Sequence, residues 1–413
     1  MPAIQPAQQA KRRPTSQPPA QPSFSDEALL LTDAPVPGRA PDELARRQED
    51  AHVWIESISG RRELEALAAE WQALADDAAE PNPFYEPWML LPALEHFGKD
   101  VEVLAAFGPH PSNAKEKRLL CGVFPIVQRR GRVEAWRHPY CYLSAPLLRK
   151  GFERKALGAF LDALGSRAQV ARFEDVPGDG PVRRHLIDEL NERGWPCVVS
   201  TCYTRAVLRR AASAEDYLAN AVPGKRRKEW RRQRARLCEQ GTLLTQELPK
   251  GDDPRSFVAE LCAMEAAGWK GREGVDASRH QAFLEQVALG ASRDGRQQLL
   301  ALRLDGKPVA LKWNLLAGEA GFAFKITFDE SYARFSPGVQ LEVDNIERAH
   351  LLPRLRFMDS CAAPNRFMIN HLWPDRREMQ TLFFATGKPL GALTVAAVPL
   401  LHFARGLLKR KPQ

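Results

Sequence analysis

Apolar residues alternate with other residues from position 321 to position 328. The apolar positions are Phe322, Phe324, Ile326 and Phe328. A period of two places these side chains on one side of an extended chain, so the segment is predicted to be a half-buried strand. Lys325 alternates with them and is predicted to face the other side, where it either lines a cleft or lies in solvent.

A helix is predicted directly after this strand. Ser336 is a favoured N-cap residue, Pro337 suits the first helical position, and Gly338 allows another backbone or a ligand to approach closely. The expected apolar face is Val339, Val343, Ile346 and His350. The free N–H groups and the dipole of such a helix start attract phosphate. Two interpretations stay open: a cofactor pyrophosphate site, or an ordinary connection between a strand and a helix.

The same patterns predict two halves with one order of elements. In the first half we expect strands at 53–55, 101–107, 119–127, 133–138, 170–176 and 197–208, and helices at 63–75, 83–96, 152–164 and 182–193. In the second half we expect helices at 216–237, 253–267, 278–291 and 336–352, and strands at 243–248, 298–304, 308–316, 321–328 and 355–358. The Asp305-Gly306 pair between two apolar runs predicts a hairpin. No residue-by-residue repeat accompanies the repeated order.

This order predicts an α/β (α+β) fold with two tandem units, each a mostly antiparallel sheet flanked by helices. We expect the units at 51–208 and 209–386. Residues 1–50 are rich in Pro, Gln, Ala and Ser, which predicts a disordered tail. Residues 387–413 are apolar and end in basic residues. They suit either a helix lying on an anionic membrane surface or a helix packed on the body of the protein.

The 413 residues carry a formal net charge of +8, which suggests an anionic partner. The seven cysteines are scattered and form no CxxC pair, which argues against a disulfide framework or a zinc site. Free cysteines fit a reducing compartment, and no apolar run follows the first basic residues as in a secretory signal. We therefore expect a cytoplasmic protein, peripheral on the inner face of the membrane if the C-terminal tail binds lipid.

Residues 213–382 resemble the bacterial GNAT acetyltransferases related to the CelD-type cellulose-biosynthesis proteins, which are similar in fold to the Fem peptidoglycan peptidyltransferases. The matching segments are the basic helix 225–237, Met264 to Gly271 (MEAAGWKG), Phe324 to Glu330 (FKITFDE), Ser336-Pro337-Gly338, Asp359 to Ala362 (DSCA) and Leu372-Trp373. Two departures are visible. Val275 follows Gly274 where the family often has Gly-Thr, and the segment from Arg334 to Gly338 is only loosely similar to the usual GNAT phosphate loop.

The resemblance implies acetyl or acyl transfer from a CoA thioester, with acetyl-CoA as co-substrate and no metal. It implies that the turn of Ser336, Pro337, Gly338 and Val339 holds the pyrophosphate through its backbone N–H groups, which Pro337 lacks, and that Arg334 adds a cation. Asp359, at the end of the next strand, is then a general base or only a turn cap. Lys325 is the second catalytic candidate.

For the acceptor, the resemblance implies contacts with Trp269, Lys270 and Asp329. A packed helix end is the alternative reading of Trp269 and Lys270. Cys361 is read as a structural thiol. The basic helix, with Lys225 and Arg227, could bind an acidic glycan, a lipid phosphate or tRNA, or simply be solvated. We expect no sequence-specific nucleic-acid binding, because no recognised module surrounds it.

Three functions remain open. The first is an acyltransferase acting on an amine or hydroxyl of a small molecule or glycan precursor of the envelope or an exopolysaccharide. The second is a Fem-like aminoacyltransferase that uses charged tRNA. The third is a non-catalytic accessory protein of exopolysaccharide synthesis. Binding of acetyl-CoA and of tRNA would separate them.

Overall fold

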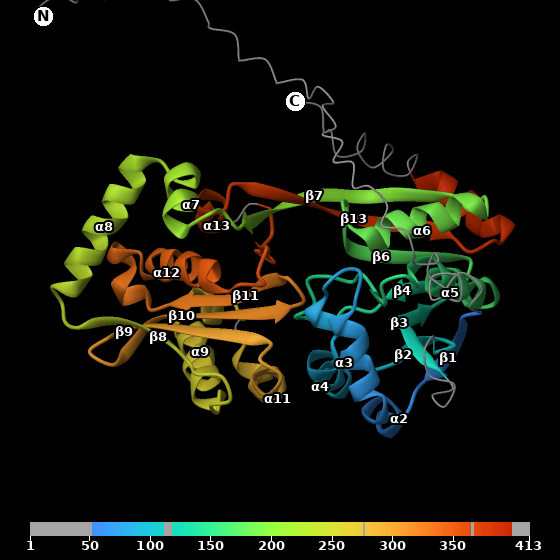
Figure 1. The fold of residues 1–413 in the computed structure, drawn as a ribbon, viewed down its shortest axis with the longest axis horizontal. Coiled ribbons are helices and arrows are strands. Elements are labelled where there is room, and N and C mark those ends of the chain that lie inside the picture. The colour runs from blue at the N-terminus through green and yellow to red at the C-terminus, as the bar shows by residue number, and fades with distance from the viewer. Residues whose placement is uncertain (1–51, 111–117, 276, 365–366, 399–413) are drawn as a thin grey trace, which may run out of the picture. The chain divides into compact units, whose positions relative to one another are not determined.

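The computed structural model describes residues 52–110, 118–275, 277–364 and 367–398, and Figure 1 shows its ribbon. Grouped by their contacts, residues 44–413 form one unit, which holds all of the described residues. The predicted tail at 1–50 lies outside the described residues.

The first half contains five helices and six strands within these described ranges. Its strands are β1 (Trp54–Ile58), β2 (Val101–Gly108), β3 (Leu119–Arg129), β4 (Arg132–Ala135), β5 (Leu147–Leu148) and β6 (Val170–Pro177). Its helices are α2 (Arg61–Ala66), α3 (Ala68–Asp76), α4 (Pro87–Phe97), α5 (Glu153–Arg167) and α6 (Pro181–Glu192), with a short 3-10 turn η1 (Pro83–Tyr85) before α4.

The second half follows the same plan. Its strands are β8 (Leu243–Glu247), β9 (Gln297–Leu304), β10 (Lys307–Ala317), β11 (Ala320–Phe328) and β12 (Phe357–Asp359). Its helices are α7 (Ala214–Ala221), α8 (Gly224–Cys238), α9 (Arg255–Ala267), α10 (Trp269–Arg272), α11 (Gln281–Arg293), α12 (Pro337–Leu351) and α13 (Phe367–Leu372), with 3-10 turns η2 (Ser278–His280) and η3 (Glu330–Phe335).

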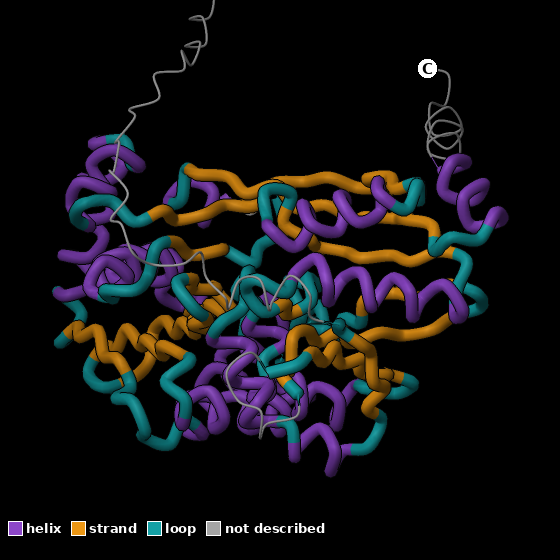
Figure 2. The backbone as a smooth tube through the Cα atoms, turned by 45° about the vertical axis from the view of Figure 1, so that its right-hand side comes forward, coloured by secondary structure: helices purple, strands orange, loops and turns teal. Residues whose placement is uncertain are grey.

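Two long strands join the halves into one sheet: β7 (Cys197–Arg209) and β13 (Asp375–Ala385). The sheet formed by the described residues has 13 strands in the order β1-β2-β3-β4-β6-β13-β7-β12-β11-β10-β9-β8, with β5 on β3. β7 follows the first half in sequence but pairs with β12, and β13 follows the second half but pairs with β6. Figure 2 shows the long strands running side by side. The α/β class with tandem units is confirmed, although the units share one sheet.

Each half contains one parallel pair of strands. β4 pairs with β6 over three residues, and β11 pairs with β12 over three residues. Beyond the first of these pairs, Arg137 forms ion pairs with Glu174 and Asp175, so charged side chains link the two segments where β4 and β6 part. The second pair opens onto the candidate active site.

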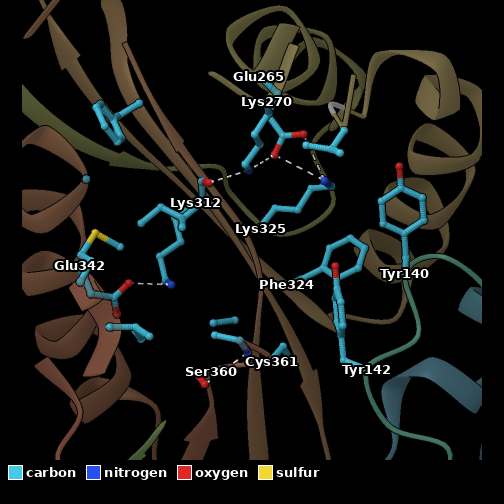
Figure 3. A pocket seen from close by; sticks show the side chains of 18 of the residues that line it. Tyr140, Tyr142, Glu265, Lys270, Lys312, Phe324, Lys325, Glu342, Ser360 and Cys361 are labelled. Carbon is cyan, nitrogen blue, oxygen red and sulfur yellow. Dashed lines mark hydrogen bonds and ion pairs between the residues drawn. The ribbon is translucent and has the colours of Figure 1, made fainter. Parts of the chain in front are cut away.

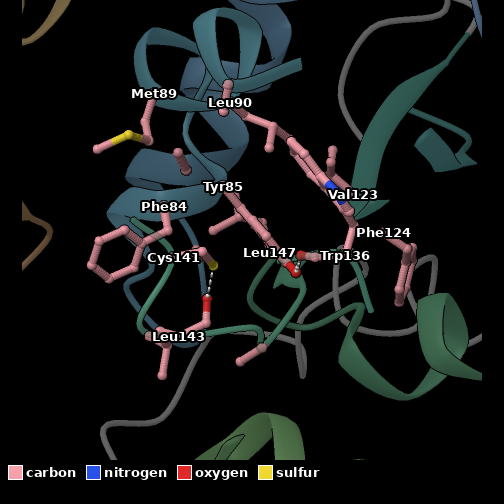
Figure 4. Packing of buried hydrophobic residues seen from close by; sticks show 14 of the residues in the cluster. Phe84, Tyr85, Met89, Leu90, Val123, Phe124, Trp136, Cys141, Leu143 and Leu147 are labelled. Carbon is pink, nitrogen blue, oxygen red and sulfur yellow. Dashed lines mark hydrogen bonds between the residues drawn. The ribbon is translucent and has the colours of Figure 1, made fainter. Parts of the chain in front are cut away.

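The buried core of the first half fixes the loop that reaches toward the second half. Figure 4 shows Tyr85 among the apolar side chains of this core. Its hydroxyl donates to the carbonyl of Trp136 at 2.6 Å, and its own carbonyl accepts from the indole of Trp71 at 2.9 Å. These buried hydrogen bonds hold the chain just before Tyr140 and Tyr142.

Two predicted helices are divided. The helix expected at 63–75 breaks at Leu67, and the one expected at 216–237 breaks at Val222-Pro223. Proline disfavours the helical conformation of the residue before it, which explains the second break. The strand β13 was not predicted. The division into units at residues 208 and 209 stays a prediction. The sheet does not follow this division, because β13 of the second unit pairs with β6 and β7.

Candidate active site

A cavity of about 680 Å³ opens where β11 and β12 part. The two strands pair from Ala320 to Phe322 and no further. Beyond that point, the end of β11 and the residues that follow β12 line the cavity instead of each other. These lining residues are Ala323, Phe324, Lys325, Ile326, Phe328, Ser360, Cys361 and Ala362. The separation of the strands therefore makes a gap through the sheet.

The cavity is lined from both faces of the sheet. Helix α12 packs on one face of β10 and β11, and α9 packs on the other face of β11. Gly338 and Glu342 of α12 line the cavity, as do Glu265 of α9 and Lys270 just after it. Figure 1 shows α12 and α9 on opposite sides of the sheet, and residues from both helices line the cavity.

On the α9 face, two lysines meet one buried carboxylate (Figure 3). The Nζ atom of Lys270 lies 2.5 Å from Oε1 of Glu265, and the Nζ atom of Lys325 lies 3.2 Å from Oε2. The amide of Ala277 also donates to Glu265, at 3.1 Å. Burial lowers the pKa of Lys325 below its ordinary value of 10.5, while the attraction of Glu265 opposes that change.

On the α12 face, Lys312 of β10 forms an ion pair with Glu342. Their Nζ and Oε2 atoms are 2.8 Å apart, and the side chains are 1% and 0% exposed. Asn345 donates to Glu342 at 2.8 Å and accepts from Asn314 at 2.6 Å. This buried network fixes the Lys312 ammonium at the wall of the cavity.

The first half supplies an aromatic wall on the α9 face. Tyr140 and Tyr142 line the cavity beside Phe324 of β11. The ring of Tyr140 lies 5.0 Å from the Lys325 ammonium, and its hydroxyl is 2.9 Å from Nδ1 of His280. Both halves therefore build the site.

The loop before α12 departs from the expected phosphate cradle. Pro337 opens the helix as predicted, but Ser336 has a left-handed backbone (φ 51°) and makes no side-chain cap. The amides of Val339 and Gln340 both donate to the Ser336 carbonyl, at 2.9 and 3.1 Å. These two N–H groups are therefore already engaged. Of the five residues assigned to the cofactor, only Gly338 lines the cavity.

Asp359 lies away from the cavity, at the centre of the sheet. It is fully buried, with Arg205 at 3.4 Å and Arg377 at 3.9 Å, and it accepts from the amide of Cys361 at 2.9 Å. This position suits charge pairing and support of the Cys361 turn rather than proton transfer from a bound ligand. Burial, and then the Asp359 carboxylate, raise the pKa of the Cys361 thiol well above its ordinary value, which does not favour a nucleophilic thiolate.

Some of the other residues predicted for the site line the cavity, and some do not. Lys325, Trp269 and Lys270 line the cavity together. The remaining ones lie outside it: Asp329 caps η3, Arg334 stacks on Phe335, and Lys225 and Arg227 lie on α8.

Sequence reasoning missed Glu265, Glu342, Lys312 and the two tyrosines. Two signals could have found the charged residues. Lys312 interrupts an apolar strand, and Glu342 lies one helical turn after Gly338, on the face that packs on the sheet. The tyrosines carried no such signal, because they come from the other half of the chain.

The comparisons with known proteins agree with this fold. Residues 224–367 match the family model described as an acetyltransferase (GNAT) domain. The chain is similar in structure to FemX, with 10% identity and a TM-score of 0.52 over 82% of this chain and 99% of the other. It is also similar to the C-terminal domain (DUF2156) of an Agrobacterium fabrum protein named as a lysylphosphatidylglycerol synthetase, with 12% identity and a TM-score of 0.51 over 83% and 98%. No curated protein sequence matches the chain.

Proposed function

The chain carries a GNAT-type acetyltransferase domain, and from this premise we propose that it transfers an acyl group from acyl-CoA to an amine. The observation that carries the proposal is the cavity where β11 and β12 part, which is lined by residues from both faces of the sheet. The donor enters from the α12 face and the acceptor from the α9 face, and they meet beside β11.

The α12 face fits the pantetheine arm of the donor. Past Phe322, β11 has lost β12 as its neighbour, so its edge can pair with the amides of an extended ligand. Apolar residues line this side, among them Ala323, Phe328 and Met368. Arg334 and the basic helix α8, which packs against η3, are cations available to the phosphates. The donor supplies a thioester; the acceptor nitrogen bonds to its carbonyl carbon while the C–S bond breaks.

Lys325 is the residue that we assign to proton transfer. An amine acceptor must lose a proton before it can attack, and burial makes the neutral form of Lys325 more accessible than that of an exposed lysine. Its neutral Nζ takes one proton from the acceptor ammonium. A second proton leaves the nitrogen when the amide forms and goes to the departing thiolate. Glu265, which is itself paired with Lys270, holds this Nζ in place.

The class of acceptor follows from the aromatic wall on the α9 face. The faces of Tyr140, Tyr142 and Phe324 attract a cationic ammonium group. An amino-sugar, amino-acid or polysaccharide precursor of the envelope or an exopolysaccharide fits this site, and scattered free cysteines support a cytoplasmic place of action.

A second candidate is transfer of an aminoacyl group from charged tRNA. The basic helix α8 supports it, because it presents many Lys and Arg residues and only Arg234 forms an ion pair with another described element, at 3.0 Å from Asp344. Such a helix attracts phosphate backbones without reading sequence.

Calorimetry with acetyl-CoA, and with charged tRNA, separates the two donors. Thiol release from acetyl-CoA with a panel of amines then tests turnover. Lys325→Met should keep acetyl-CoA binding and abolish thiol release. Gly338→Gln should weaken binding by filling the slot beside Phe328, and Gly338→Glu should weaken it further by repelling phosphate. Absence of acetyl-CoA binding to the unmodified protein would refute the proposal.

A further inference from the structure

A second hollow lies on the first half, away from the residues of the active-site cavity. It has a volume of about 770 Å³ and is formed between the turn from β3 to β4 and the chain after β13. Its lining residues are Arg129, Arg130, Gly131, Arg132, Gln169, Val170, Phe383, Leu390 and Thr394. Basic and apolar side chains that are far apart in sequence therefore meet on one surface.

The helical segment 389–398 is fixed on this surface. Val395 is buried and packs with Val170 and Ala385. A Cβ atom on Gly391 would lie 1.9 Å from the carbonyl oxygen of Gln169, so only glycine allows this close approach. Figure 2 shows the segment at the end of the long strands, leading toward the C-terminus. The reading of this segment as a helix packed on the body is supported for its described part.

Although the segment is anchored, its leucines point outward. Leu390 is 62% exposed and Leu393 is 69% exposed. They are three residues apart and thus share one side of the helix. An anchored helix that keeps two neighbouring leucines in water presents an apolar face with no partner among the described residues.

The charges beside this face are almost all positive. Arg129 and Arg130 form no ion pair within the described part of the chain, whereas Arg132 pairs with Glu134 at 2.6 Å. Within the sequence that follows residue 398, the basic residues are Arg405, Lys409, Arg410 and Lys411, and the large apolar residues are Leu400, Leu401, Phe403, Leu407 and Leu408. The sequence that follows therefore contains further basic and apolar residues.

We propose that Arg129, Arg130, Arg132, Leu390 and Leu393 form a docking surface, the Arg–Leu surface, for a membrane of anionic phospholipid. Guanidinium groups bind lipid phosphates, and leucines on an amphipathic helix enter the boundary between headgroups and acyl chains. A polyanion such as RNA would use the arginines but not the leucines. A second copy of the chain would bring like charges together. The inference is independent of the proposed acyl transfer.

Flotation of the full chain with vesicles tests the proposal. Vesicles of phosphatidylcholine mixed with phosphatidylglycerol should bind the protein, and vesicles of phosphatidylcholine alone should not. The double change Arg129→Gln and Arg130→Gln should lower partitioning about thirtyfold, from about fivefold for each basic residue. Leu390→Ser with Leu393→Ser should also release the protein, and these exposed positions leave the core intact.

Matched controls come from other exposed sites. Arg231→Gln in α8 and Leu351→Ser, whose side chain is 75% exposed, should leave vesicle binding unchanged. The proposal is overturned if the controls release the protein and the variants of the Arg–Leu surface do not. It is also overturned if only the arginines matter and tRNA competes fully with the vesicles, because the surface would then bind a polyanion.

Discussion

Glu265→Gln should destabilise the protein and change the pH dependence of its activity. Glu265 is fully buried and is the counter-charge of Lys325 and Lys270. Glutamine keeps the shape and can still accept from the Ala277 amide, but it removes the negative charge. At 3.2 Å and an effective dielectric constant near 20, one such pair is worth roughly 5 kcal/mol. Removing one partner of a buried pair typically costs about 3–5 kcal/mol.

The sign of the pH dependence follows from Lys325. Its folded-state pKa lies below 10.5, the value for the unfolded chain, so the folded state holds fewer protons between these two values. Stability therefore rises with pH across that window. Loss of Glu265 lowers the folded-state pKa further and widens the window toward lower pH. The destabilisation should be largest near neutral pH and should shrink as the pH approaches 10.5.

Urea unfolding over a pH series measures this effect. Glu260→Gln is the matched control, because Glu260 lies on the same helix and pairs with Arg303 near the surface at 2.6 Å. That change should cost about 1 kcal/mol or less at every pH. For activity, the rise of kcat/KM with pH should move to lower pH in Glu265→Gln. If the variant instead loses thiol release at all pH values while still binding acetyl-CoA, Lys325 acts as a cation and not as the proton acceptor.

Three further predictions concern separate parts of the molecule. Asp359→Asn leaves Arg205 without its full counter-charge and should cost about 3–5 kcal/mol in urea unfolding; a changed pH profile of kcat/KM would show that Asp359 does act as the base. Burial raises the pKa of Glu86 to about 7 from 4.5, so this residue should lower stability by about 3 kcal/mol as the pH rises across that range; Glu86→Gln should remove this contribution in thermal unfolding and leave that of Glu80, whose pKa burial also raises to about 7. Tyr142→Ala should raise the KM for the amine acceptor about tenfold and leave the KM for acetyl-CoA unchanged, whereas Tyr142→Phe should change neither KM. An equal change in both KM values would contradict the assignment of the acceptor to the α9 face and of the donor to the α12 face.

Local patterns predicted the elements around the site well. The alternation at 321–328 predicted the strand β11, but it also placed Lys325 on the face opposite the phenylalanines, which is wrong for Phe324. A register shift in the pairing with β10 breaks the alternation there, so Phe324 and Lys325 both lie against Tyr140 in the cavity. The Asp305-Gly306 turn and the helix start at Pro337 were also found where expected. These features depend on backbone preferences that lie within a few residues.

The charged partners could not be predicted because they depend on tertiary contacts. A glutamate in a helix is normally solvated, so nothing in the segment around Glu265 indicates that it is buried and meets Lys325 of β11. Helix α12 shows the same limit. Of the predicted apolar face, Ile346 and His350 are buried, but Val339 and Val343 are less buried than Leu341, Glu342 and Asn345. The buried face is wider than predicted, because the ion pair with Lys312 allows the Glu342 carboxylate to be buried.

The exchange of β7 and β13 between the halves has a consequence for synthesis on the ribosome. The edge of β6 that faces β13 has no partner until the end of the second half has been made. Pro177 ends β6 and Asp375 begins β13, so roughly 200 residues separate them, and their translation takes about 10–40 s. During that time the nascent chain exposes an unpaired strand edge, which other chains can join. Chaperone binding to the nascent first half is therefore expected to last until β13 emerges.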